Sequence, residues 1–110
     1  MLTNIFIMGQ KWKLILTSPE QDSRLKDAWG YCDWTIRTIV VCAERDEDTN
    51  LINFEKLVNK VIRHEIIHAF MYESGLMENE VLDNDQRVDW LAYQYPKIQK
   101  IFNKLGIGED

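Results

Sequence analysis

The apolar and polar positions in the first half of the chain follow the two-residue period of β-strands. In residues 11–17 the two kinds alternate, which places Trp12, Leu14 and Leu16 on one side of an expected strand. Residues 1–9 fit another strand. Two more segments fit strands, the second of them rich in β-branched side chains: residues 31–34 and 36–43. This half of the chain therefore predicts a small antiparallel sheet of about three strands.

The second half of the chain has the 3.6-residue period of helices. A long helix is expected to begin near Asn50 or Asn53, because either side chain can cap it. It is expected to end at Gly75, which suits the left-handed position after a helix. Its apolar positions lie on one side at first and surround the axis from Ile66 onward, so we expect the middle of this helix to be buried.

A second helix is expected over residues 81–95. Pro96 then stands where a new helix can begin, and residues 98–105 carry an apolar stripe. The predicted fold class is therefore α+β. We expect a single domain over residues 1–110, in which the small sheet packs on the long helix and on one or two further helices.

The composition excludes several classes of function. The 110 residues include 18 acidic and 13 basic ones, so the net charge is −5, and 45% of the chain is hydrophobic. This is typical of a globular domain and lacks the basic footprint of a protein that binds nucleic acid or an anionic membrane. No apolar run approaches the ~18 residues of a membrane span. Because the first residues also lack a basic export signal, we expect a cytoplasmic protein in which Cys32 and Cys42 stay reduced.

The segment His64-Glu65-Ile66-Ile67-His68 is the strongest chemical signal in the sequence. Histidines four residues apart on a helix lie one turn apart on the same face, where both imidazoles can bind one Zn²⁺ at about 2.0–2.1 Å. Glu65 points about 100° around the helix from the first histidine. It therefore lies beside the metal, where it can act as general base for a water molecule that zinc activates.

Chance is a poor explanation of this motif. The chain has only two histidines, and this spacing with a glutamate after the first is expected by chance on the order of once in several hundred such chains. A buried helix with three such polar groups is also costly unless they share a task. Two alternatives stay open: a zinc site that supports folding without catalysis, and a metal-free helical interaction module. Glu65 favours catalysis, because a purely structural zinc site does not need it.

A catalytic zinc site also needs a third protein ligand and an open position for water. The candidates are Asp85 and Asp89 on the second helix. Asp85 falls within the inward stripe that Val88 and Ala92 define, and Asp89 lies nearer its edge. We therefore favour Asp85 as the third ligand and Asp89 as the carboxylate that orients a histidine ring. The reverse assignment stays open, as does the possibility that both are solvent-facing charges. Glu73, at the end of the first helix, is expected to brace the loop rather than bind metal.

Two stretches carry a resemblance to a known family. Residues 64–76 (HEIIHAFMYESGL) and 84–92 (NDQRVDWLA) resemble small phage- and prophage-encoded zincin-like metallopeptidases, related to the ImmA/IrrE-type peptidases and to compact gluzincins. The likeness covers roughly residues 28–98. It implies a minimal zincin, with a twisted sheet, an active-site helix and a following helix that carries an acidic ligand. In gluzincins this ligand belongs to an Asn-Glu-x-x-x-Asp pattern. Here Asp85 replaces that glutamate and Asp89 matches the aspartate, so the shorter Asp85 requires the two helices to approach more closely.

The motif and the resemblance together predict a hydrolase. We expect a zinc-dependent peptidase that uses metal-activated water to cleave a peptide bond of a protein or peptide substrate. Related peptidases that cleave repressor proteins imply a protein substrate by analogy only. The strand over residues 36–42 is a candidate edge for pairing with an extended substrate. Tyr72, Tyr93 and Tyr95 are equivalent candidates for polarising the substrate carbonyl.

Overall fold

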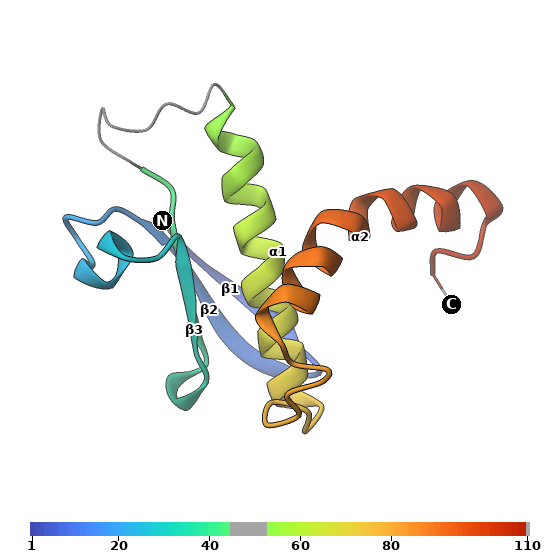
Figure 1. Cartoon of the computed structure of the whole chain (residues 1–110), viewed down its shortest axis with the longest axis horizontal. Helices are drawn as coiled ribbons and strands as arrows, with labels where there is room; N and C mark the ends of the chain where they lie inside the picture. Colours follow the sequence, from blue (N-terminus) through green and yellow to red (C-terminus); the bar gives the residue numbers. More distant parts are fainter. Residues whose placement is uncertain (45–52, 110) are drawn as a thin grey trace.

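In the computed structural model, which describes residues 1–44 and 53–109, four strands form one sheet and two long helices stack on one side of it (Figure 1). The strands are β1 (Leu2–Ile7), β2 (Gln10–Thr17), β3 (Gly30–Asp33) and β4 (Thr38–Cys42). The helices are α1 (Phe54–Glu73) and α2 (Asp85–Leu105), and two short 3-10 helices flank β3: η1 (Ser23–Lys26) and η2 (Trp34–Ile36). The predicted α+β class is confirmed.

The sheet is mixed, so the prediction of an antiparallel sheet of about three strands is wrong. The strand order is β1-β2-β4-β3, in which β2 pairs with β1 in antiparallel and with β4 in parallel orientation. After β2 the chain crosses through η1 to β3 at the sheet's outer edge and only then returns as β4, antiparallel to β3. All five residues of β4 are buried, and a strand of this kind is stable in the centre of a sheet, where neighbours cover both faces.

Because β4 lies in the centre of the sheet, the prediction that residues 36–42 form a substrate-binding edge is wrong. Residues 36–42 cannot offer a free edge, because β4 lies between β2 and β3 and Ile36 belongs to η2. In the part of the sheet that the structure describes, the edge strands are β1 and β3. Of these two, β3 has the more extensive contact with α1.

The helix α1 has the predicted cap and end, but the burial expected around its axis is wrong, because Phe70 is 46% exposed and lines an open groove with Ile66 and Ile67. The Asn53 side chain accepts a hydrogen bond from the backbone N–H of Lys56 at 3.2 Å, which satisfies one of the free donors of the first turn. The helix ends at Glu73, and Gly75 has the expected left-handed conformation with a φ of 80°. Asn50, the other proposed cap, lies outside the described residues.

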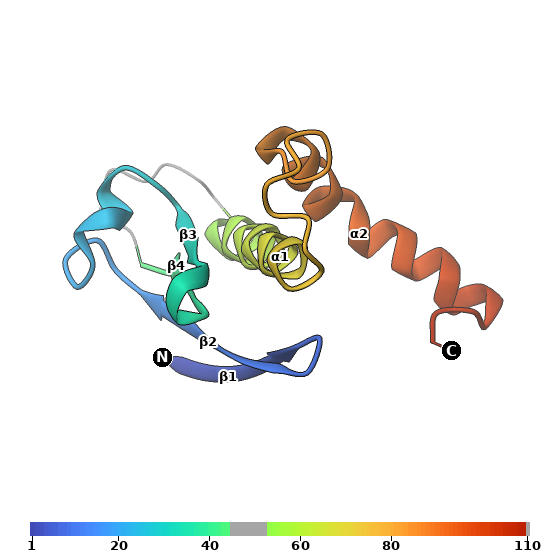
Figure 2. The same cartoon turned by 90° about the horizontal axis from the view of Figure 1, so that it is seen from below.

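The main core lies between the sheet and α1 (Figure 2). The alternation of residues 11–17 has the predicted effect, because Trp12 is completely buried and Leu14 nearly so, while Leu16 packs against the same cluster. The buried members come from both elements: Ile7, Trp12, Leu14, Ile39, Val41, Val58, Val61 and Ala69. A smaller cluster, in which Leu25 of η1 packs on the opposite face of the sheet, covers β4 from the other side.

Gly30, the first residue of β3, allows the sheet edge to approach α1 closely. A Cβ atom at this position would lie 2.8 Å from Cγ1 of Val61 and 3.0 Å from the carbonyl oxygen of Val40, and Val61 is only 5% exposed. We therefore expect Gly30→Ala to lower the free energy of unfolding by about 1–3 kcal/mol, as other overpacked cores do. Urea unfolding measures this loss. In a Val61→Ala background, Gly30→Ala should cost less stability, because the Val61 methyl group that obstructs the new Cβ is gone. If the two substitutions cost the same together as the sum of their separate costs, the close contact is contradicted.

The helix α2 begins later than predicted. Asn84 is its cap, and its side-chain oxygen accepts hydrogen bonds from the backbone N–H groups of Gln86 and Arg87 at 2.9 and 3.3 Å. Val81, the predicted first residue, lies instead in a turn, where its N–H donates to the Asn79 side chain. Asparagine is a strong cap, and it leaves residues 81–84 as a connecting turn.

The helix also continues through Pro96, so the predicted second and third helices are one. Proline has no N–H with which to satisfy the carbonyl four residues earlier, which is that of Ala92. Arg63 of α1 supplies the missing donor, because its Nε bonds the Ala92 oxygen at 2.7 Å. Because this hydrogen bond replaces the one missing at Pro96, a single helix runs from Asp85 to Leu105.

The elements form three layers: the sheet, then α1, then α2 (Figure 2). The first half of α2 packs on α1 through Val88 and Ala92, which are 1% and 0% exposed. Its second half extends away from the rest of the molecule (Figures 1 and 2). None of the helices in residues 1–44 and 53–109 is long and apolar enough to cross a membrane.

Candidate metal centre

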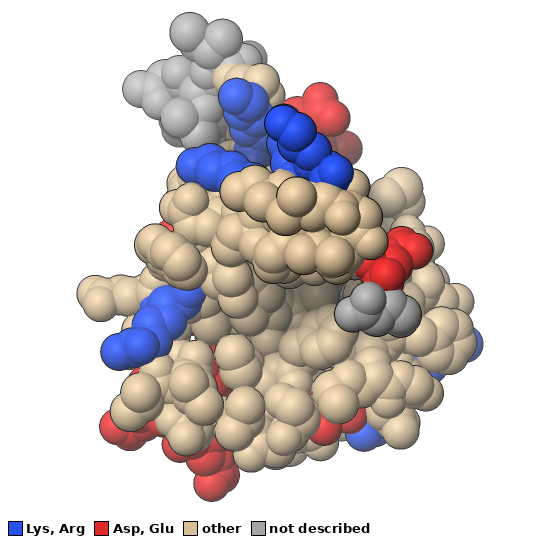
Figure 3. Space-filling view, turned by 90° about the vertical axis from the view of Figure 1, so that its right-hand side faces the viewer, with Lys and Arg blue, Asp and Glu red and all other residues tan. Residues whose placement is uncertain are grey.

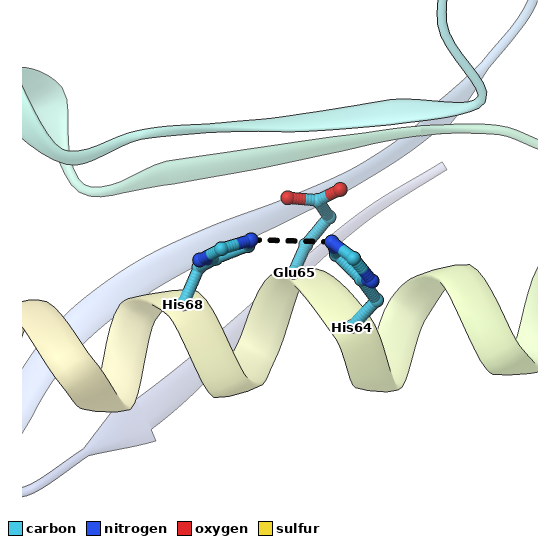
Figure 4. Close-up of side chains that lie close together, drawn as sticks. All are labelled: His64, Glu65 and His68. Atoms are coloured by element: carbon cyan, nitrogen blue, oxygen red, sulfur yellow. Dashed lines mark hydrogen bonds between the residues drawn. The ribbon is translucent and has the colours of Figure 1, made fainter. Parts of the chain in front are cut away.

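The two histidines of the motif lie on one face of α1 and turn toward each other (Figure 4). The Nε2 atoms of His64 and His68 are 3.1 Å apart, and their ring centroids are 4.8 Å apart. Both side chains are largely buried, with 16% and 20% of their surface exposed. The i, i+4 spacing on a helix produces this arrangement without help from the rest of the fold.

Asp85, the first residue of α2, brings a carboxylate to the same point. Its Oδ1 lies 2.8 Å from Nε2 of His68 and 3.4 Å from Nε2 of His64. The Asp85 side chain is 85% exposed, which differs from the inward carboxylate that the sequence pattern predicted. The helix begins only at this residue, so Asp85 stands at the open mouth of the site. The case for a ligand role therefore rests on these distances and not on the cost of burial.

Two further carboxylates contact the opposite nitrogen of each ring. Asp89 Oδ1 lies 3.0 Å from Nδ1 of His64, and Asp83 Oδ1 lies 2.6 Å from Nδ1 of His68. A carboxylate accepts hydrogen bonds, so when each ring is neutral these contacts place its proton on Nδ1 and leave Nε2 with its lone pair. Lys60 in turn holds Asp89 through a 2.8 Å ion pair. The contact of Asp89 with His64 is the one expected from the sequence.

These proton positions leave three acceptors facing one another. They are Nε2 of His64, Nε2 of His68 and Oδ1 of Asp85, separated by 2.8, 3.1 and 3.4 Å. Three acceptors at such distances repel one another unless a cation lies between them. Ligands about 2.0–2.1 Å from a tetrahedral Zn²⁺ are separated by roughly 3.3 Å, so the three atoms fit three corners of a zinc site.

Glu65 lies beside this group. Its carboxylate sits between the two rings and is turned toward the sheet (Figure 4), and the residue is only 7% exposed. One ligand atom each from Glu65, His64 and His68 falls within 4.8 Å of the others. By distance Glu65 could also reach a metal, but Asp85 is much closer to both Nε2 atoms. Glu65 is therefore placed to act on a molecule bound at the fourth corner.

The electrostatics of the centre show how strongly its groups interact. Burial raises the pKa of Glu65, although the two histidines partly oppose this rise. Burial lowers the pKa of His68, but its hydrogen bonds with Asp83 and Asp85 outweigh this and leave that pKa above its ordinary value. Burial raises the pKa of Asp85, whereas its hydrogen bond with His68 lowers it, and the net pKa is low. The hydrogen bonds of the Asp83 and Asp85 carboxylates therefore favour a positive charge on the His68 ring.

The centre opens into a pocket of about 710 Å³ between β3 and the start of α2. Apolar and aromatic side chains form its wall beyond the histidines, and Trp34 stacks on Tyr72 with centroids 5.3 Å apart. Burial raises the pKa of Cys32 to about 12, with Glu65 adding to the rise, so its thiol stays protonated at neutral pH. The lining comprises Gly30, Tyr31, Cys32, Trp34, His64, Glu65, His68, Tyr72, Met77, Asp83, Asp85, Gln86 and Asp89.

The three tyrosines considered for polarising a substrate carbonyl lie in different places. Tyr72 lines the pocket, whereas Tyr95 lines a different groove and Tyr93 is half exposed under the ammonium group of Lys60. Glu73 was expected to brace the loop after α1, but its side chain contacts the sheet instead. Its Oε1 accepts hydrogen bonds from Trp12 Nε1 at 3.0 Å and from Arg37 Nε at 2.7 Å, which ties the end of α1 to the sheet.

Asp83 is the contact that the sequence pattern missed. It belongs to the turn before α2, and its place beside His68 depends on where that helix begins. The only sign of this contact in the sequence was an acidic residue directly before the capping Asn84. Its spacing from the histidines matches no metal-binding motif that the sequence analysis used. Lys60 was also missed, because a lysine on α1 looks like an ordinary surface charge until Asp89 is placed opposite it.

In comparisons with known proteins, no protein-family model, no curated protein and no solved structure matches the chain. The resemblance to zincin-like peptidases therefore rests on the motif alone.

Proposed function

We propose that this chain is a zinc-dependent peptidase of minimal zincin type. The observation that carries the proposal is the convergence of three acceptor atoms, from His64, His68 and Asp85, with a buried Glu65 beside them. A structural zinc site fills all four positions with protein groups, whereas three ligands leave one position for water. This open position and the adjacent carboxylate favour catalysis over a purely structural role.

Each residue then has a chemical task. His64, His68 and Asp85 would hold a zinc ion, which would supply a Lewis acid that makes water easier to deprotonate. Glu65 accepts a proton from the attacking water and passes it to the leaving amine, and its raised pKa suits both transfers. Asp89 and Asp83 hold the two rings in the tautomer that directs Nε2 into the site. Tyr72 is the lining residue whose hydroxyl can polarise the scissile carbonyl.

An extended peptide fits the pocket better than a compact small molecule. The strand β3 has a neighbouring strand on one side only within the described sheet, and its residues line the pocket. Free backbone groups along such an edge can pair with a peptide backbone. A substrate paired in this way runs between β3 and the histidines of α1, which brings a peptide bond to Glu65. The substrate class we propose is therefore an unfolded or flexible segment of a protein.

Metal analysis and proteolysis of the purified protein test the proposal. We expect one zinc per chain and cleavage of a flexible protein such as casein, measured by mass spectrometry of the products. A chelator should stop cleavage while circular dichroism keeps most of the helical signal, and added zinc should restore activity. Unfolding on chelation, without cleavage before it, would indicate a structural zinc. Absence of stoichiometric zinc would refute the metal centre.

A further inference from the structure

The second half of α2, residues 96–105, is an amphipathic helix without a partner in the described chain; we call it the arm. It projects from the body of the molecule (Figures 1 and 2). Its apolar stripe is exposed to water, with exposed fractions of 60% at Ile101, 41% at Phe102 and 66% at Leu105. Lys100 and Lys104 directly precede Ile101 and Leu105 and lie about 100° round the helix from them. A helix with one apolar face is stable when that face is buried.

The same chain has an apolar groove where the arm leaves α1. The groove has a volume of about 510 Å³, and its apolar lining is Ile66, Ile67, Phe70, Met71, Leu91 and Tyr95. Figure 3 shows the molecule from the side on which the arm ends, with a hollow among uncharged side chains and most of the charged ones toward the margins. Within α1, Ile66 and Phe70 lie on the opposite side of the helix from the histidines. Ile67 and Met71 each follow a histidine by three residues and lie about 60° round the helix from it.

The arm cannot fill the groove of its own chain. Tyr95 borders the groove, and the arm continues directly from it as part of the same helix. The hydrogen bond from Arg63 to the carbonyl of Ala92 keeps the helix continuous across Pro96. A rigid helix that starts at the rim of a groove points away from it, so a matching arm must come from another molecule.

The exposed area is large enough for a stable interface. Five large side chains of the arm and the groove are between 41% and 66% exposed: Phe70, Tyr95, Ile101, Phe102 and Leu105. At about 200 Å² for each whole side chain, they leave on the order of 500 Å² uncovered. Two copies then contribute roughly 1,000 Å², which is the minimum expected of a specific interface, before any polar rim is counted.

From these observations we infer that the chain forms a symmetric dimer, in which the arm of each copy lies in the groove of the other. A two-fold axis makes both arm–groove contacts at once and closes the assembly, so neither an arm nor a groove remains unpaired. The four helices concerned, α1 and α2 of each copy, pack together as a bundle. The groove and the metal pocket have no lining residue in common, so the metal pocket of each copy stays open to substrate.

Sedimentation and light scattering of the full chain over a range of concentrations test the dimer. The arm variant is Ile101→Gln with Leu105→Gln. Its matched control is Lys100→Gln with Lys104→Gln, in which each substitution lies one residue earlier, about 100° round the same turns. We expect the wild type and the control to be dimers. The arm variant should raise the dimer dissociation constant by about a hundredfold or more, as the loss of two central anchors does. Circular dichroism checks that each variant is folded.

A variant of the groove distinguishes a dimer with reciprocal arm–groove contacts from a dimer in which the two arms pair with each other. Phe70→Gln should also weaken the dimer, and mixing it with the arm variant should recover a heterodimer, because one intact arm then meets one intact groove. A wild type that stays monomeric at high concentration would overturn the inference, whether or not it binds a different protein. A dimer that survives the arm variant would overturn it as well. So would a dimer that survives Phe70→Gln, since the arms would then pair with each other.

Discussion

Replacement of Glu65 by glutamine is expected to lower kcat for peptide hydrolysis by about a thousandfold or more, with the zinc content unchanged. Glutamine has nearly the same size and cannot accept the proton of the attacking water, so only the base is removed. The Glu65 carboxylate lies beside the histidines but is not the closest acid to their Nε2 atoms, and for this reason metal binding should survive. Single-turnover assays and metal analysis of the same preparations measure the two effects.

The matched control is Glu55→Gln, at the exposed first turn of the same helix, which should leave kcat unchanged. Retention of more than a tenth of the wild-type activity by Glu65→Gln would assign the base to another group. Stability gives an independent readout in the metal-free protein. Because burial raises the folded-state pKa of Glu65, the wild-type carboxylate costs stability above its unfolded-state pKa of about 4.3. Glu65→Gln should therefore be more stable than wild type at pH 7, and this advantage should shrink as the pH falls from the raised folded-state pKa toward about 4.3, below which it is lost.

Substitution of Asp85 by alanine is expected to reduce zinc affinity more than any other change among the three aspartates. Asp85 alone places an oxygen near both Nε2 atoms, so its loss leaves only two protein ligands. Asp89→Asn and Asp83→Asn disturb the outer contacts of the rings and should each cost about 10–100-fold in affinity. Competition with a chromophoric chelator measures all three values.

Asp27→Asn, an exposed change outside the pocket, serves as the control and should leave the affinity unaltered. The order of effects decides between the two assignments that the sequence left open. If Asp89→Asn removes zinc while Asp85→Ala changes the affinity by less than tenfold, then Asp89 is the ligand and Asp85 is a charge at the mouth of the pocket. Asp85→Glu should keep much of the affinity, because the longer acid can still reach the site from an exposed position.

Much of the candidate centre follows from local spacing. The facing rings of His64 and His68 and the sideways place of Glu65 need only an α-helix over residues 64–68. The helix itself was predictable from its apolar period, its cap at Asn53 and the glycine at its end. The nearness of Asp85 and Asp89 to the histidines was also predicted, although Asp85 proved exposed rather than inward.

Contacts between segments far apart in the sequence were harder to predict. The parallel pairing of β2 and β4 depends on the path of the chain through β3, which hydrophobic alternation does not encode. Alternation reports which side of a strand is buried but not which strand lies next to it. For the same reason the sequence pointed to residues 36–42 as the substrate edge, whereas the exposed edge near the site is β3. Proline suggested a break in α2, and only the distant Arg63 explains why the helix continues.

The sequence by itself therefore determined the elements whose cause is local: an α+β chain, a capped long helix, and two imidazoles with a carboxylate beside them on one helical face. The tertiary structure decided which groups come to that face from elsewhere. It placed Asp83, Asp85 and Asp89 around the rings, set β3 against them through Gly30, and left the arm without a partner. The physical reason is the range of the interactions, because helix geometry relates residues three or four apart, whereas the meeting of α1 with α2 depends on the packing of the whole chain.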